Sequence, residues 1–543
     1  MRLAVGAAAL VAVAAVAYLY GLGHAFIPSI GDEPLYLQIA RRTLESGRLL
    51  PLLSDSGITD TKPPLLFWQG MAAARLAGPG LLWLRLPDVL LTLGTAALAG
   101  WLAARLSGRR FIGLLAAVVF LGFRSTVQHG RPFLTNAGET FFLFLPLALA
   151  WGRPRLGAGV ALACGASLGA AALYKSFAVI LPGVLGLALV LRHQSGLAAG
   201  PFLRRHGTFL ALSATAGLAI FGVWLLLDPR PDLVLAQFVL QENAGKLQPG
   251  GWLAGLLSGP YPLWRLWLGP LANAGLLAPV VAGLLADLWR RRHALPAAEA
   301  QLWLYLLAFL LFYSLPAQRQ ANYLLPAMAA LAVLLALRWE AIGPAWFRLA
   351  LVPLALAAAL LPVLEARVER AAGAPLWGVG AWALPLALAA LAAAGAVRAG
   401  LGRALLPALA LLAVVAVTGF LAPFSRPLPA AVAAELGGRP VPFPERFQRE
   451  SELYRFLAPG ADVRGYPCPP APAACPVPAG LAPGAYVATY ASTVRAPPGF
   501  TLVAELPHLR SRHSAAEVRA MAKGDLGPLL EHLLLLRVTP PGA

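Results

Sequence analysis

The sequence predicts an all-α polytopic membrane protein that carries a small α/β domain at its C-terminal end. Of its 543 residues, 59% are hydrophobic and only 12% are charged, whereas soluble globular proteins carry roughly 45–50% apolar and about 25% charged residues. A chain this apolar cannot cover itself with polar surface, which excludes a soluble enzyme, a disordered protein and a disulfide-rich secreted domain. The net charge of +19 lies in short basic clusters between apolar runs, a pattern that encodes membrane topology and does not indicate nucleic-acid binding.

Thirteen apolar stretches are candidates for membrane-spanning helices, because a bilayer is crossed by about 20 mostly apolar residues. Their approximate bounds are 3–22, 85–104, 111–123, 136–152, 157–173, 176–191, 208–227, 265–288, 300–316, 323–337, 347–363, 375–397 and 404–423. The first lacks a convincing small-residue cleavage site, so we interpret it as a retained helix and not as a signal peptide. The stretch 65–83 is interrupted by Arg75 and by Gly-Pro-Gly at 78–80, and we expect it to lie along the membrane surface.

The basic clusters predict the orientation of these spans. Thirteen spans place the two termini on opposite sides, and the connections on the side of the N-terminus are short and almost purely basic. These connections hold Arg105, Arg109 and Arg110, then Arg153 and Arg155, then Arg204 and Arg205, and finally Arg290, Arg291 and Arg292. Because cytoplasmic loops carry an excess of Lys and Arg, we expect a cytoplasmic N-terminus in a bacterial inner membrane.

Two outer segments are too long to be simple connections. The first, 23–84, contains amphipathic helix-forming sequence within a membrane module that we place at 1–423. The second, 424–543, is less hydrophobic and long enough for a small periplasmic or other extracytoplasmic domain. Alternation in 485–490 and 500–506 predicts strands, and Ser514 with Glu517 predicts a capping box that opens a helix.

The most informative motif follows the first span and contains the adjacent carboxylates Asp32 and Glu33. Neighbouring carboxylates at a membrane surface attract a metal, a cationic substrate or a proton in transfer. The alternative is that Asp32 caps a helix over 34–45 with Pro34 in its first turn, where both residue types are favoured. Capping leaves Glu33 unexplained and does not exclude catalysis.

The positions of the lysines form a second informative pattern. Lysine is rare in this chain, since only four of the 43 basic residues are Lys. Lys62, which precedes two prolines and an apolar run, presents one ammonium at headgroup depth and suits a lipid phosphate. The alternative is a lysine whose stem lies along apolar surface while its head reaches water. Lys175 and Lys246 also fall on outer loops beside the membrane.

Further ionisable groups on the expected outer side are Arg131, Glu139, Arg319 and the segment 242–246. Charges near membrane depth are costly and favour a functional interpretation. Any one of them could be a solvated loop charge, but several loops that each supply one or two such groups indicate a shared site for an anion.

Together these motifs resemble the GT-C glycosyltransferases of the protein-mannosyltransferase superfamily, which includes the lipid A aminoarabinose transferases. The resemblance rests on five motifs within about 1–340 that occur in the same order and spacing. They are Asp32-Glu33, Lys62-Pro63-Pro64-Leu65, Arg131 with Thr135 before Phe141-Phe142, Lys175, and Arg319 with Tyr323-Leu324-Leu325-Pro326. It implies a GT-C-like fold and an enzyme that uses a polyprenyl-phosphate sugar.

The resemblance also implies roles for individual residues. Asp32 matches the catalytic carboxylate, with Glu33 beside it, and Lys62 meets the carrier phosphate. Lys175, Lys246, Arg319 and Tyr323 complete the expected donor-binding set. The family's Thr-Asp is replaced here by Thr135-Asn136, and Glu139, one helical turn later, is positioned to substitute. Arg131, Asn136 and Glu139 are therefore expected at the acceptor or a second site, and no cofactor is certain, with a divalent metal left open.

These observations favour an inverting glycosyltransferase that moves a hexose or pentose from the carrier to lipid A, a glycan or a protein outside the cytoplasm. The alternative is a transporter or flippase for a lipid-linked glycan, in which ionisable groups would lie near the bilayer midplane. Cys468 and Cys475, with six residues between them, are expected to form a disulfide in an oxidising compartment, unless the intervening prolines hold them apart.

Overall fold

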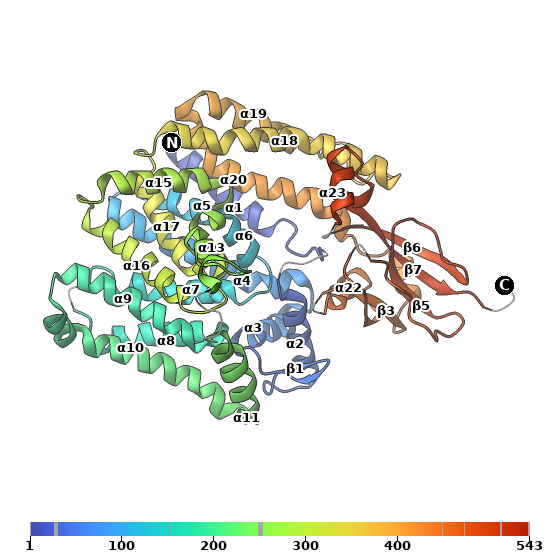
Figure 1. Cartoon of the computed structure of the whole chain (residues 1–543), viewed down its shortest axis with the longest axis horizontal. Helices are drawn as coiled ribbons and strands as arrows, with labels where there is room; N and C mark the ends of the chain where they lie inside the picture. The colour runs from blue at the N-terminus through green and yellow to red at the C-terminus, as the bar shows by residue number, and fades with distance from the viewer. Residues whose placement is uncertain are drawn as a thin grey trace.

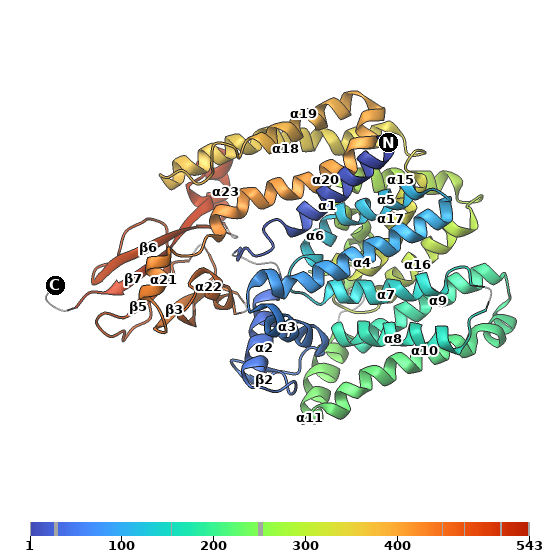
Figure 2. The same ribbon diagram turned by 180° about the vertical axis from the view of Figure 1, so that it is seen from behind.

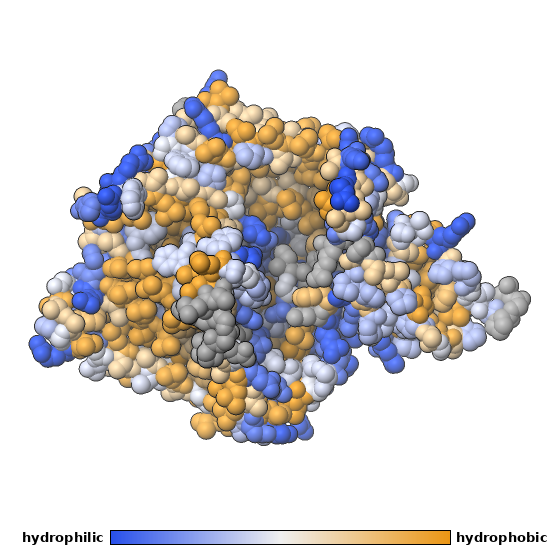
Figure 3. Space-filling model, viewed as in Figure 1, coloured by the Kyte–Doolittle hydropathy of each residue, from blue (hydrophilic) through white to orange (hydrophobic). Residues whose placement is uncertain are grey.

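The computed structural model describes residues 2–26, 31–153, 155–247, 254–447, 449–471, 473–510 and 513–540. It consists of a large helical body with a small sheet-containing domain at one end, and the two parts lie side by side in both ribbon views (Figures 1 and 2). Hydrophobic side chains cover most of the helical body on the face drawn in Figure 3. The chain is therefore a multi-pass membrane protein, as its composition predicts.

Each expected span overlaps a helix, although 265–288 is divided among several elements and 375–397 becomes helical only from Ala383. The helices are α1 (Arg2–Leu19), α4 (Leu81–Ser107), α5 (Arg110–Gly122), α7 (Asn136–Ala150), α8 (Ala158–Tyr174), α9 (Ile180–Ser195), α10 (Ala199–Leu227), α15 (Ala278–Arg291), α16 (Ala297–Ser314), α17 (Leu325–Arg338), α18 (Pro344–Ala372), α19 (Ala383–Val397) and α20 (Ala399–Leu421). Within the described residues, eight helical stretches can each cross a membrane by length and hydropathy, or nine if the pair α5 and α6 (Arg124–Gly130), bent by 67°, is one span. Four further apolar helices are shorter, so the number thirteen stays a prediction.

Helix α17 lies at the centre of the body, where every residue from Leu325 to Ala336 is buried. Peripheral helices approach one another through small residues, which allow close backbone contact in place of a hydrophobic driving force. At the α8–α10 contact, a Cβ added to Gly165 would lie 2.6 Å from the Cβ of Ala216. Larger residues there would separate the two helices.

The first outer segment folds into two helices joined by a hairpin. Helix α2 (Glu33–Glu45) confirms the expected helix over 34–45, and strands β1 (Leu53–Ser54) and β2 (Gly57–Ile58) pair antiparallel. Helix α3 (Leu65–Ala77) is shorter than the expected 65–83, because Gly78 adopts a φ of 96° and ends it. The residues after Gly80 start α4 instead.

The residues between the long helices form short connecting elements. These are η1 (Phe177–Val179), α11 (Pro231–Leu233), η2 (Val234–Asn243), η3 (Ala244–Leu247), α12 (Ala254–Leu257), α13 (Leu263–Trp267), α14 (Gly269–Ala274), η4 (Gly275–Leu277), η5 (Ala321–Leu324) and η6 (Ala422–Ser425). Element η2 is a π-helix, a form that often marks functional segments.

The C-terminal domain has the mixed α/β character that its sequence predicts. After α21 (Ala430–Glu435), strand β3 (Pro440–Glu445) pairs parallel with β4 (Asp462–Pro467) across α22 (Ser451–Leu457). A second sheet has the order β5 (Tyr486–Ala491), β7 (Leu530–Val538), β6 (Phe500–Leu509) and is antiparallel. Helix α23 (Ala515–Ala522) begins at the predicted capping box, and η7 (Gly527–Leu529) precedes β7.

Candidate functional site

Asp32 lies at the N-terminal end of α2, but its side chain makes no capping hydrogen bond to the described first turn of that helix. Instead, Tyr36 Oη donates to Asp32 Oδ2 at 3.2 Å. Burial, followed by the charges of Asp32 and Glu242, raises the pKa of Tyr36 above its ordinary value. Tyr36 therefore stays a neutral donor that orients the Asp32 carboxylate.

Glu33, which we expected beside Asp32 as a second catalytic carboxylate, forms a buried ion pair. It is 2% exposed, and Arg85 binds both of its oxygens, with Nε–Oε1 at 2.7 Å and Nη2–Oε2 at 2.9 Å. The backbone N–H of Phe133 also donates to Oε1 at 2.8 Å. These contacts hold Glu33 against α4 and the chain before α7, next to Asp32, and its expected catalytic role stays a prediction.

Arg85 was missed by sequence reasoning, although it is a charged residue near the start of an apolar span. Its Nη1 donates to the carbonyl oxygens of Leu22 and His24 at 2.7 and 2.8 Å. A buried ion pair with every polar atom engaged avoids the penalty of an unpaired charge. The pair thus also fixes the chain that follows α1.

Lys62 lies opposite the π-helix η2, and its Nζ is 3.3 Å from Glu242 Oε2. Both side chains are partly exposed. Glu242 belongs to the 242–246 segment that the sequence singled out, but its pairing with Lys62 could not be read from spacing. Lys246 falls in η3, and its side chain lies outside the described part of the structure.

A second lysine pair lies deeper in the helical body. Lys175, directly after α8, places Nζ 3.4 Å from Glu139 Oε2, and Tyr313 Oη donates to Glu139 Oε1 at 3.4 Å. The Lys175 ammonium lies 5.8 Å from the ring centroid of Tyr323. Glu139 is 1% exposed and pairs with Lys175, and its expected role at the acceptor or a second site stays a prediction.

Arg319 and Arg131 both contact backbone oxygens. Arg319 is 2% exposed and donates to the carbonyls of Ser314, Gly255 and Tyr261 at 3.0, 3.2 and 3.3 Å. It therefore holds α12 and the loop before α13 against the end of α16, and its expected contact with the carrier phosphate stays a prediction. Arg131 donates to the Tyr20 carbonyl and lies 3.4 Å from Thr418 Oγ1, and Asn136 is buried at the start of α7.

A partly buried chain of polar side chains that the sequence did not reveal joins α3, α4 and α8. Gln69 Nε2 donates to Asp88 Oδ1 at 3.1 Å, and Tyr174 Oη donates to Gln69 Oε1. Asp88 is fully buried in α4. The only sign of this chain in the sequence was an Asp inside an apolar run. The partners of Asp88 are known only from the three-dimensional structure. Because Tyr174 directly precedes Lys175, these hydrogen bonds fix the end of α8 next to that lysine.

A cavity of about 550 Å³ lies beside Glu33 and Arg85, between the end of α1, the bend from α5 to α6, and α20. Its apolar wall comes mainly from α20, and Arg124 and Arg131 supply positive charge. The cavity suits an amphiphile with an anionic head.

The structure pairs Cys468 with Cys475, whereas Cys164 is free and buried. No group of three or more His, Cys, Asp or Glu residues within the described ranges is placed to hold a metal ion. The described site contains two lysine–glutamate pairs, Asp32 and tyrosines.

Residues 32–226 match the family described as dolichyl-phosphate-mannose-protein mannosyltransferase. An uncharacterized protein of Aquifex aeolicus (strain VF5) is 28% identical over 132 residues, which make up 24% of this chain and 26% of that protein. The chain therefore matches about a quarter of this relative's length.

Among solved structures, ArnT from Cupriavidus metallidurans bound to undecaprenyl phosphate is similar with a TM-score of 0.62 and 20% identity, over 84% of this chain and 85% of ArnT. The apo state of ArnT gives a TM-score of 0.57 and 18% identity over 86% of each chain. The chain thus has the GT-C type of fold found in ArnT, as the sequence resemblance implied.

Proposed function

From this fold and the site within it, we propose that the chain is an integral membrane glycosyltransferase that takes a sugar from a polyprenyl-phosphate carrier. The observation that carries the proposal is the hydrogen bond from Tyr36 to Asp32, because the charge of Glu242, the partner of Lys62, also acts on Tyr36 and helps to raise its pKa. The family match spans Asp32, Lys62, Glu139 and Lys175. The similarity in fold to a protein crystallised with undecaprenyl phosphate supports the same donor class.

Lys62 and Lys175 bind the carrier phosphate in this proposal. In the structure each ammonium already faces a carboxylate, Glu242 and Glu139 respectively, so each is held in place before the donor arrives. The phosphate then competes with Glu242 for Lys62, because that pair is partly exposed. Cations placed where negative charge develops stabilise the transition state.

The transfer is a single displacement with inversion. The acceptor hydroxyl oxygen attacks the anomeric carbon while the bond from that carbon to the phosphate oxygen breaks, and the phosphate leaves with the electron pair. Asp32 takes the hydroxyl proton as general base. Tyr36 orients the Asp32 carboxylate, and the Glu33–Arg85 pair fixes its backbone.

The acceptor enters through the cavity beside Glu33. Its apolar wall on α20 and two of its three arginines, Arg124 and Arg131, favour an anionic amphiphile such as lipid A over a protein or an uncharged glycan. The third, Arg85, is paired with Glu33.

We place the N-terminus in the cytoplasm of a bacterial cell and residues 424–543 outside it. An alkaline phosphatase fusion at Ala543 is then active and one after Arg292 is inactive, and the reverse pattern overturns this orientation.

Reconstituted protein tests the reaction itself. With a polyprenyl-phosphate sugar and a lipid acceptor in proteoliposomes, we expect sugar on the acceptor and free polyprenyl phosphate in equal amounts. A flippase would move the donor across the bilayer and leave it chemically intact. That result, with no released carrier, would reject the enzyme and support the transporter.

A further inference from the structure

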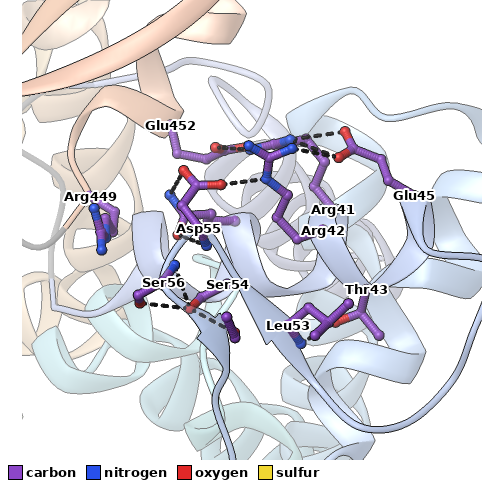
Figure 4. A network of polar contacts seen from close by, with 12 residues as sticks. Arg41, Arg42, Thr43, Glu45, Leu53, Ser54, Asp55, Ser56, Arg449 and Glu452 are labelled. Atoms are coloured by element: carbon purple, nitrogen blue, oxygen red, sulfur yellow. Dashed lines mark hydrogen bonds and ion pairs between the residues drawn. The ribbon is translucent and has the colours of Figure 1, made fainter.

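The C-terminal domain contacts the helix that carries Asp32 through one carboxylate. Glu452 on α22 binds Arg41 on α2 with both oxygens, at 2.6 Å for Nε–Oε1 and 2.9 Å for Nη2–Oε2 (Figure 4). The two residues are 411 positions apart in the sequence. Bidentate arginine–carboxylate pairs are strong and geometrically specific.

Glu452 is rigidly held within its own domain. Its side chain is 3% exposed, and Arg455 Nε donates to its Oε2 at 3.1 Å. Arg455 in turn donates through Nη2 to the carbonyl of Val463 on β4 at 2.8 Å. The Glu452 carboxylate, which binds Arg41, therefore moves together with the β3–α22–β4 unit.

On the other side, α2 is tied to its hairpin. Arg42 pairs with Asp55, and Gln38 Nε2 donates to Asp55 Oδ2 at 2.9 Å. The N–H of Leu53 donates to Thr43 Oγ1 at 2.9 Å (Figure 4). These contacts hold the C-terminal half of α2, while the Glu33–Arg85 pair holds its first residue.

The ion pair is not needed to attach the domain to the membrane module. The chain itself continues from α20 through η6, and an apolar cluster of Val368, Leu376, Phe424 and Leu530 packs the domain against α18. The Arg41–Glu452 contact instead connects the domain to α2. Arg41 follows Asp32 by nine residues, roughly 13 Å along a helix that rises about 1.5 Å per residue.

We propose that Glu452 is a positioning residue of the active site: through Arg41, the C-terminal domain sets the placement of α2 and hence of the Asp32 carboxylate. This inference rests on the proposed role of Asp32 as general base. Because the Glu33–Arg85 pair holds the first residue of this short helix, loss of the contact at Arg41 lets the helix tilt about that end and turn the Asp32 carboxylate beside it. The domain thus contributes to turnover without touching the donor or the acceptor.

The test compares Glu452→Gln, Arg41→Gln and the double variant in the full-length protein. We expect each single change to lower kcat about tenfold, within the hundredfold that a misplacement of about 1 Å can cost. The dissociation constant for undecaprenyl phosphate should stay unchanged. Because both changes break the same contact, the double variant should be no slower than the slower single variant. The matched control, Asp462→Asn, breaks an exposed pair with Arg464 in the same domain and should leave kcat unchanged.

Hydrogen exchange separates positioning from simple stabilisation. We expect the backbone amides of Tyr36 and Leu37 to exchange faster in Glu452→Gln, while amides in the central strand β7 keep their protection. If Glu452→Gln folds poorly, Arg41→Lys keeps the charge but loses the bidentate geometry, and the same slower kcat is expected.

A normal kcat in both Glu452→Gln and Arg41→Lys would overturn the inference, as would additive losses in the double variant. The proposed function is tested separately by Asp32→Asn. If Asp32→Asn is inactive while the Glu452 variants are fully active, only the positioning role fails. If Asp32→Asn is fully active, the general-base role fails.

Discussion

Replacing Asp32 with Asn should remove most turnover while leaving the fold and donor binding intact. The Asn side-chain oxygen can still accept the hydrogen bond that Tyr36 now donates at 3.2 Å. Asn is also about as favourable as Asp at the first position of a helix. The Glu33–Arg85 pair next to it is unchanged. The substitution therefore removes the proton acceptor and little else.

The size of the effect follows from the role. General-base catalysis contributes roughly 10²–10⁴-fold, which at about 1.36 kcal/mol per factor of ten raises the barrier by about 3–5 kcal/mol. The assay measures initial rates of sugar transfer at saturating donor together with the affinity for undecaprenyl phosphate. Asp232→Asn is the matched control, because Asp232 is an exposed acid on another segment between spans, paired only with Arg230 among the described residues. An Asp32→Asn protein with wild-type kcat would refute the catalytic assignment and return Asp32 to a purely local role.

Four further outcomes are expected. Glu33→Gln should lower the unfolding free energy by about 3–5 kcal/mol, because it leaves the buried Arg85 charge uncompensated; thermal unfolding in detergent measures this, and an unchanged melting temperature would contradict it. Lys62→Ala should weaken binding of undecaprenyl phosphate, and Lys62→Arg should restore it only in part, since a guanidinium does not replace a compact ammonium; full binding by the Ala variant would rule out the phosphate contact. Burial raises the pKa of Asp60 to about 7, so the folded state holds a proton that the unfolded state releases. The free energy of unfolding should fall as pH rises from about 4 to 7 and then level off. In Asp60→Asn, the unfolding free energy should depend less steeply on pH across that range. An unchanged slope would show that another group causes the pH dependence. Cys468 and Cys475 should resist alkylation in denatured, unreduced protein and react after reduction, with Cys164 as the internal free-thiol control; modification of both without reductant would exclude the bridge.

The sequence by itself determined the class of fold and the position of most elements. Long apolar runs can be stable in only one way inside a bilayer, as helices that satisfy their own backbone hydrogen bonds, so the spans were predictable from composition and length. The capping box at Ser514 and the helix after Asp32 were likewise local properties. The order of Asp32, Lys62, Lys175 and Tyr323 was sufficient to recognise a resemblance and to suggest a donor site.

The tertiary structure decided which charged side chains meet. Glu33 lies next to Asp32 in sequence, yet its partner is Arg85, 52 residues away. Glu139 pairs with Lys175, Lys62 with Glu242, and Glu452 with Arg41. An ionisable side chain beside a membrane is equally compatible with catalysis, ligand binding or a structural pair until its neighbours are known. Since electrostatic energy depends on distance through space and on burial, no spacing along the chain could make that choice.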